Sequence, residues 1–383
     1  DLIILHINAF KKNFEKYIKG HLGEVGGSVD AEAYKITINL EKDSIDCALK
    51  LIPLINNEAK NIMNLSYKSW KELYILKMIY NLIKNHNCPN VPIIYIYFIC
   101  KDCKVQDYLN PNITRYYNNL NIRQKIEQKD SNDSVLKRMN RKKGYGTNAL
   151  CILNELCTSS LKDLLVDTYI DNIDDNIFNS FIFQILSGVY SIHKLCHICH
   201  FDLHGGNILV SVIKSNGYWL YNINNEDYYI PNNGYILKIW DFGRSMIINV
   251  DEPKDIYVQI IHQCKRFFKD AFKKNPKLEK HIYKKLTKDN LPIILFAFDL
   301  WRIISYLYSK FKKETYYEAK FKNTIALLNN IKKDCENNWV LQLINSKTIS
   351  NEPHIFMNYL LNKYFSNYMK IQKNLINNKK YVI

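Results

Sequence analysis

The chain has 383 residues, of which 47% are hydrophobic, and 53 basic against 37 acidic side chains give a formal net charge of +16. This length and composition support one large or two modest domains with an apolar core, and no uncharged apolar run reaches the ~18 residues of a membrane span. Residues 1–3 have neither the basic leader nor the cleavage site of a signal peptide, and the absence of an initiator methionine indicates a trimmed chain or a fragment.

The positive charge raises the question of an anionic partner. Nucleic acid or an anionic membrane surface would suit +16. The lysines are scattered rather than gathered in one stripe, so we favour a solvated basic surface. Ten cysteines, several inside apolar runs, indicate reduced thiols in a cytoplasmic protein rather than a disulfide framework.

The chain begins with a predicted amphipathic helix at residues 1–20, because apolar residues recur there at steps of three and four. Alternating apolar and polar residues predict strands at 34–40 and 45–51. Between the helix and these strands lies a turn whose backbone amides could cover phosphates. The turn is rich in small residues: Gly26, Gly27, Ser28 and Ala31.

Lys50 lies in the second of these strands, and we expect its partner to be an acid on the next helix. Helical spacing predicts that helix at 69–83, with Glu72 in its first turn. Glu72 is therefore our choice for the ion pair with Lys50. Glu58 is the alternative if the helix begins earlier.

Two further buried strands are predicted at 91–100 and 149–156. The residues between them, about 104–147, are polar and lack periodicity, so we interpret them as an insertion. The basic run at 137–143 could bind an anionic partner, although a solvated loop is the default interpretation.

A strongly periodic helix at 178–193 leads into His-Phe-Asp-Leu-His-Gly-Gly-Asn at 200–207. Phosphoryl transfer gives a reason for this pattern. Asp202 could take or orient the proton of an attacking hydroxyl, and Asn207 could offer a neutral oxygen to magnesium. Asp241 follows at the end of a second apolar run, in Asp-Phe-Gly, and supplies the hard oxygen that magnesium prefers.

These two motifs resemble the catalytic loop and the metal-binding Asp-Phe-Gly of the protein kinase superfamily. The resemblance implies an α+β fold of two lobes, with ATP and Mg2+ (Mn2+ as the alternative) between them. The small antiparallel β-rich N-lobe would be residues 21–157 and the larger α-helical C-lobe residues 158–383. Insertions would lie at about 104–147 and 211–234, and the second insertion is predicted to form an extra hairpin.

By the same resemblance, each motif residue takes a role. Lys50 would hold the α and β phosphates, and Glu72 would hold Lys50. Backbone groups of Glu155 and Cys157 would meet the adenine edge, with Asn154 guarding the back pocket. Asp202 would serve the acceptor hydroxyl, and metal binding would fall to Asn207 and Asp241. The small-residue turn would cover the phosphates with Gly26, Gly27 and Ser28.

Several departures from the family pattern are informative. Phe201 replaces the arginine that usually precedes the catalytic aspartate, so a phosphorylated activation loop is a less suitable on-switch. His204 replaces a lysine, and with an ordinary pKa of about 6.5 its contact to the γ-phosphate is weaker at neutral pH. Asp-Leu-His at this place is similar to aminoglycoside and choline kinases and to kinases of large DNA viruses; the overall pattern favours the viral group.

Beyond Gly243 the family pattern weakens, since no Ala-Pro-Glu follows. A strongly apolar helix is predicted at 295–308, and its Asp299 is expected to brace the backbone of the catalytic loop. Amphipathic helices are predicted at 316–338 and 355–378.

Two groups of cysteine and histidine invite a zinc interpretation. The first has a single CxxC and no second pair, so buried reduced thiols are favoured; it comprises His86, Cys88, Cys100 and Cys103. The second overlaps the catalytic loop, which explains His200 without zinc; it comprises Cys196, His197, Cys199 and His200.

The leading hypothesis is an ATP-dependent protein kinase acting on serine or threonine, with tyrosine left open. A small-molecule kinase is the second hypothesis, motivated by Asp-Leu-His. A pseudokinase scaffold is the third, motivated by Ser28 and Ala31, and nucleic-acid binding is the fourth. Retention of the complete metal-binding and catalytic set argues against a scaffold.

Overall fold

The chain divides into two compact units, each built from helices and mainly antiparallel strands, which makes it an α+β protein. The first unit comprises residues 1–74 and 92–157, and the second comprises residues 75–91 and 158–383. The two-lobed arrangement implied by the family resemblance stays a prediction. The computed structural model describes residues 3–6, 23–27, 32–39, 44–101, 145–166, 171–248, 291–313, 315–344, 353–369 and 376–382.

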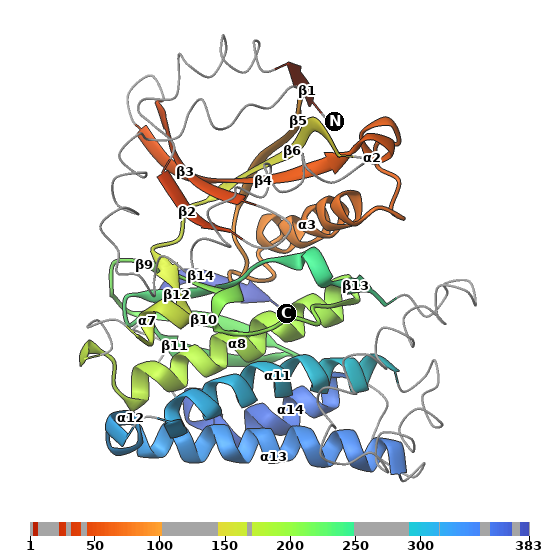
Figure 1. Cartoon of the computed structure of the whole chain (residues 1–383). Helices are drawn as coiled ribbons and strands as arrows, with labels where there is room; N and C mark the ends of the chain where they lie inside the picture. The colour runs from red at the N-terminus through yellow and green to blue at the C-terminus, as the bar shows by residue number, and fades with distance from the viewer. Residues whose placement is uncertain are drawn as a thin grey trace. The chain divides into compact units, whose positions relative to one another are not determined.

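The first unit is organised around a six-stranded sheet in the order β1-β5-β6-β4-β3-β2 (Figure 1). Every neighbouring pair is antiparallel except β1 and β5, which run parallel. The strands are β1 (Ile3–His6), β2 (Gly23–Gly27), β3 (Glu32–Asn39), β4 (Ser44–Ile55), β5 (Ile94–Lys101) and β6 (Tyr145–Glu155).

The strands predicted around Lys50 are confirmed. On β3, Tyr34 and Ile36 are buried while Lys35 between them is exposed, as expected for a strand with one face on the core. The chain then forms the short helix α2 (Asn56–Lys60) and the long helix α3 (Lys68–Lys84). The helix predicted at 69–83 is therefore also confirmed, and it places Glu72 in the first unit.

The second unit is built on long helices. Figure 1 shows α8, α11 and α13 stacked side by side within this unit. The buried helix α8 begins at the Asp174 N-cap, whose carboxylate accepts from the Ile177 N–H at 2.8 Å. The helices are α7 (Leu161–Leu164), α8 (Asp175–Cys196), α11 (Leu291–Lys313), α12 (Thr315–Lys320), α13 (Lys322–Ile344) and α14 (Pro353–Tyr364).

Short strands complete the second unit in three small sheets. The hairpin predicted within 211–234 is confirmed, since β10 and β11 pair antiparallel and are connected by a two-residue turn. The turn residues, Asn224 and Asn225, both have positive φ. The strands are β7 (Ser159–Ser160), β8 (Ile198–Cys199), β9 (Ile208–Val212), β10 (Tyr218–Ile223), β11 (Glu226–Pro231), β12 (Tyr235–Ile239), β13 (Met246–Ile247) and β14 (Ile376–Val382).

Two helix predictions are wrong at the ends of the described chain. Ile3–His6 form β1 because they pair with β5 at the edge of the sheet, a long-range contact that outweighs the local helical spacing. Ile376–Val382 form β14, which pairs with β10, so the helix predicted at 355–378 gives way to a strand over its last residues.

Other predictions fall on residues outside the described ranges. They concern residues 7–20, Ser28, Ala31, Cys103, the basic run at 137–143 and most of the insertion at 104–147; the last residues of that insertion belong to β6. Within the described ranges, no helix combines the length and the apolar character needed to cross a lipid bilayer.

Candidate functional site

Lys50 and Glu72 form a buried ion pair in the first unit. Lys50 Nζ lies 2.6 Å from Glu72 Oε1, and the two residues are 7% and 4% exposed. β4 and α3 present these side chains to each other, so the predicted partner is the correct one. Removing either partner of such a pair would leave an uncompensated buried charge and destabilise the fold.

Glu58, the alternative partner, has a different role. Its carboxylate accepts hydrogen bonds from two backbone N–H groups, Ser69 at 3.1 Å and Ile55 at 3.4 Å. The carboxylate therefore connects the start of α2 to the start of α3 and helps to fix the helix that carries Glu72.

The segment expected to meet adenine begins where β6 ends. The N–H of Glu155 donates to the Ile93 carbonyl at 2.8 Å, and its carboxylate accepts from the Ile93 N–H at 3.1 Å. The Glu155 carbonyl accepts from Asn154 Nδ2 at 2.9 Å. Cys157 follows at intermediate exposure.

In the second unit, Asp299 on α11 braces the backbone of residues 200–207, the loop predicted to be catalytic. Its carboxylate is fully buried and accepts from the N–H of His200 at 2.6 Å and of Phe201 at 2.9 Å, and lies 2.9 Å from His193 Nε2. The predicted bracing role of Asp299 is therefore confirmed. Phe201 has φ of +63°, a strained conformation that this double hydrogen bond can maintain.

The buried position of Asp299 also affects its protonation. Burial alone would raise the pKa of this carboxyl, but the hydrogen bond and charge of His193 and the contacts with His200 outweigh it and hold the pKa below its ordinary 3.8. Asp299 is thus a charged acceptor, the type that binds backbone N–H groups most strongly.

A second set of hydrogen bonds joins the catalytic loop to the Asp-Phe-Gly segment. The Trp240 N–H donates to the Asn207 carbonyl at 2.9 Å, and His200 Nε2 lies 2.9 Å from the Trp240 carbonyl. Phe242 is buried against the His200 ring, with ring centroids 4.9 Å apart. These contacts fix Asp241, which follows Trp240 directly, beside the loop that carries Asp202 and Asn207.

The side chain of Asn207 is oriented by a hydrogen bond to Asp202, the predicted catalytic residue. Its Nδ2 donates to the Asp202 carbonyl at 2.9 Å. With the nitrogen committed in this way, the amide oxygen is the atom that would ligate a metal. Together with the Asp241 carboxylate it would offer only oxygen donors, the ligand type that fits Mg2+ and Mn2+.

Two arginines that the sequence interpretation did not identify contact Asp202. Arg302 Nη2 lies 2.7 Å from Asp202 Oδ1, and Arg244 Nη1 lies 3.4 Å from Oδ2. Arg302 is three residues after Asp299, one helical turn along the same face of α11, and that spacing was a usable signal. Arg244 follows Gly243 directly.

His204 lies close to Asp202 and Arg302, but it does not supply the positive charge of the lysine that stands at this position in the kinase pattern. Burial lowers its pKa below the ordinary 6.5; Arg302 and His200 act in the same direction, against the opposing charge of Asp202. Its Nδ1 accepts from the Gly206 N–H at 3.0 Å, as an unprotonated ring nitrogen does. The positive charge near Asp202 therefore comes from the arginines.

The described cysteines are poorly suited to zinc. Burial raises the pKa of Cys88 to about 11 and of Cys196 to about 12, which favours the thiol over the thiolate that zinc requires. His193, Cys199 and Asp299 bring potential ligand atoms within 4.8 Å of one another. These atoms already contact one another through hydrogen bonds that brace the catalytic loop.

No protein-family model matches the chain. A probable serine/threonine-protein kinase of Invertebrate iridescent virus 6 is 25% identical over 242 residues, which cover 62% of this chain and 39% of that protein. A protein of Frog virus 3 (isolate Goorha), provisionally named a serine/threonine-protein kinase, is 32% identical over 83 residues, or 21% of this chain and 10% of that protein.

An uncharacterized protein of Acanthamoeba polyphaga mimivirus is 26% identical over 245 residues, or 52% of this chain and 32% of that protein. All three relatives come from large DNA viruses, the group that the sequence motifs favoured. The alignments with this chain span well under half the length of each of these relatives.

Proposed function

We propose that this chain, a divergent relative of kinase-like proteins of large DNA viruses, is an ATP-dependent protein kinase that transfers the γ-phosphate of Mg-ATP to serine and threonine hydroxyls. The observation that carries the proposal is the braced loop of the second unit. That loop carries the Asp202 carboxylate and the Asn207 amide, and its backbone is hydrogen-bonded to Asp299.

Each residue would then act in a definite way. Asp202 would orient the acceptor hydroxyl and take its proton as the new O–P bond forms. Arg302 and Arg244 would keep the carboxylate in one orientation. Lys50, held by Glu72, would contact the nucleotide phosphates. Asn207 and Asp241 would hold magnesium, which neutralises charge on the phosphates when bound.

A small-molecule kinase is the second candidate, and a specific observation favours it. His204 lies beside a pocket of about 400 Å³, a volume typical of small-ligand sites. The phosphate acceptor of such a small-molecule kinase would be the hydroxyl of a free metabolite rather than that of a protein side chain. A pseudokinase scaffold is less well supported, because binding alone does not need the Lys50–Glu72 pair together with Asp202 and Asn207, and the chain retains them all.

The acceptor class decides between these candidates. The purified chain would be incubated with labelled ATP and Mg2+, with a general protein acceptor in one arm and a panel of aminoglycosides, choline and other hydroxylated compounds in the other. We expect label in protein, recovered as phosphoserine or phosphothreonine after acid hydrolysis. Label in a free compound alone would replace the proposal with the second candidate, and phosphotyrosine alone would overturn the acceptor class.

A matched pair of lysine variants controls this assay. Lys50→Met should abolish transfer, whereas Lys35→Met, on the neighbouring strand and exposed beside Asp46, should leave it unchanged. Equal transfer by the two variants would contradict the role given to Lys50.

A further inference from the structure

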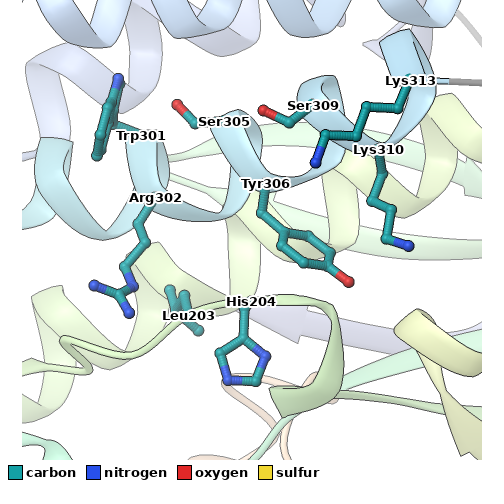
Figure 2. A pocket seen from close by; sticks show the side chains of 9 residues that line it. All are labelled: Leu203, His204, Trp301, Arg302, Ser305, Tyr306, Ser309, Lys310 and Lys313. Atoms are coloured by element: carbon teal, nitrogen blue, oxygen red, sulfur yellow. The ribbon is translucent and has the colours of Figure 1, made fainter. Parts of the chain in front are cut away.

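A pocket of about 400 Å³ in the second unit lies between α11 and the residues that follow Asp202 (Figure 2). No described residue that lines it is acidic, and three carry a permanent or nearly permanent positive charge. The lining residues are Leu203, His204, Trp301, Arg302, Ser305, Tyr306, Ser309, Lys310 and Lys313.

The wall formed by α11 follows from helical spacing. Arg302, Tyr306 and Lys310 are four residues apart, so they lie on one face of the helix. Figure 2 shows these three side chains projecting from α11 toward the loop that carries Leu203 and His204. One helical face thus brings two cations and a phenol to the catalytic loop.

The pocket also contains polar groups that have no partner within the described part of the chain. Ser305 Oγ and Tyr306 Oη are buried and have no hydrogen-bond partner among the described residues. Burial, with the nearby charge of Asp163, raises the pKa of Tyr306, so the phenol stays protonated and can donate. A buried donor without a partner is costly, and a bound acceptor would remove that cost.

The pocket is close to the reacting group. Arg302, which lines it, lies 2.7 Å from Asp202 Oδ1. Tyr306 packs tightly on the catalytic loop, because a Cβ added at Gly205 would come within 2.5 Å of Tyr306 Cε1. An acceptor chain with its hydroxyl at Asp202 would therefore pass the pocket within a few residues.

Cationic side chains with unpaired hydroxyl donors are the chemistry that binds a carboxylate or a phosphate. We propose that this pocket is an acceptor subsite for an acidic or phosphorylated side chain that lies near the serine or threonine to be phosphorylated. The inference rests on the proposed function and names the substrate class of the same site, namely acidic peptides.

Lys312 provides the matched control. It occupies the same last turn of α11 as Lys310 and Lys313, and it shares with them any favourable interaction with the helix C-terminus. It pairs with Glu318 and does not line the pocket. If the pocket is a subsite, substitution of Lys310 and Lys313 should therefore weaken binding there, whereas substitution of Lys312 should not.

The test measures binding and transfer separately on the full chain. Fluorescently labelled serine peptides with aspartate, phosphoserine or lysine flanks would be titrated by anisotropy at one ionic strength, and the same peptides would then be used as acceptors. We expect acidic and phosphorylated peptides to bind roughly tenfold more tightly than the basic peptide. The Lys310→Ala/Lys313→Ala variant should lose that preference and Lys312→Ala should keep it.

The outcomes separate the two proposals. Transfer to peptides without a preference for acidic flanks would keep the kinase and overturn the subsite. Selective binding that depends on Lys310 and Lys313, without transfer to any peptide, would keep the subsite and overturn the protein kinase. Stronger binding of the phosphorylated than of the aspartate peptide would identify phosphate as the preferred anion within the same inference.

Discussion

The Lys50–Glu72 pair allows stability and catalysis to be separated by mutation. Lys50→Met alone would leave Glu72, which is 4% exposed, as an uncompensated buried charge. Removing one partner of such a pair typically costs about 3–5 kcal/mol of unfolding free energy. The double variant Lys50→Met/Glu72→Leu replaces both charges with apolar side chains, and we expect it to recover most of that loss while staying inactive.

The exposed pair of the same unit is the control for this cycle. Lys35 and Asp46 are also 2.6 Å apart, but their side chains are 46% and 44% exposed. Their coupling should therefore be only about 0–1 kcal/mol. Urea unfolding of each single and double variant, followed by fluorescence, gives both coupling energies. Equal coupling in the two pairs, or a double variant that transfers phosphate, would refute the reasoning.

Three further predictions concern the braced loop. Asp299→Asn should lower the unfolding free energy by about 3 kcal/mol in denaturant titrations, since an amide satisfies fewer of the N–H donors. Because the pKa of Asp299 is held below 3.8, the ionised carboxylate contributes fully to the unfolding free energy above that pH. In the wild type this contribution should be lost as the pH falls below 3.8, and the Asp299→Asn variant should show no such loss. Gly205→Ala should destabilise the protein by about 1–3 kcal/mol through its clash with Tyr306, and adding Tyr306→Leu should recover part of the loss in thermal melts. Arg302→Gln should lower kcat roughly tenfold and have no further effect in an Asp202→Asn background, as steady-state kinetics would reveal.

Much of the local structure was predictable because the pattern and the contacts agree. Alternation around Lys50 predicted β3 and β4, and helical spacing predicted α8 and α11. Asp299 could be identified because the resemblance placed a bracing acid on a strongly apolar helix. Glu72 rather than Glu58 could be chosen because the helix was predicted to begin near residue 69.

The remainder depends on contacts between distant residues. The Arg302–Asp202 pair joins positions 100 residues apart, and although the spacing from Asp299 places Arg302 on the same face of α11, that spacing does not identify Asp202 as its partner. β14 pairs with β10, in which Tyr218 is the partner of Ile376, 158 positions later in the chain, and β1 becomes a strand only because β5 provides an edge. In these cases tertiary pairing determines the structure where local propensity is weak.

The most direct measurement is transfer of labelled γ-phosphate from ATP with Mg2+ by the wild type, by Asp202→Asn and by the exposed control Asp46→Asn. The account predicts transfer by the wild type and by the Asp46 variant, and a loss of at least about a hundredfold in the Asp202 variant. Undiminished transfer by Asp202→Asn, or no transfer by the wild type with nucleotide bound, would contradict it.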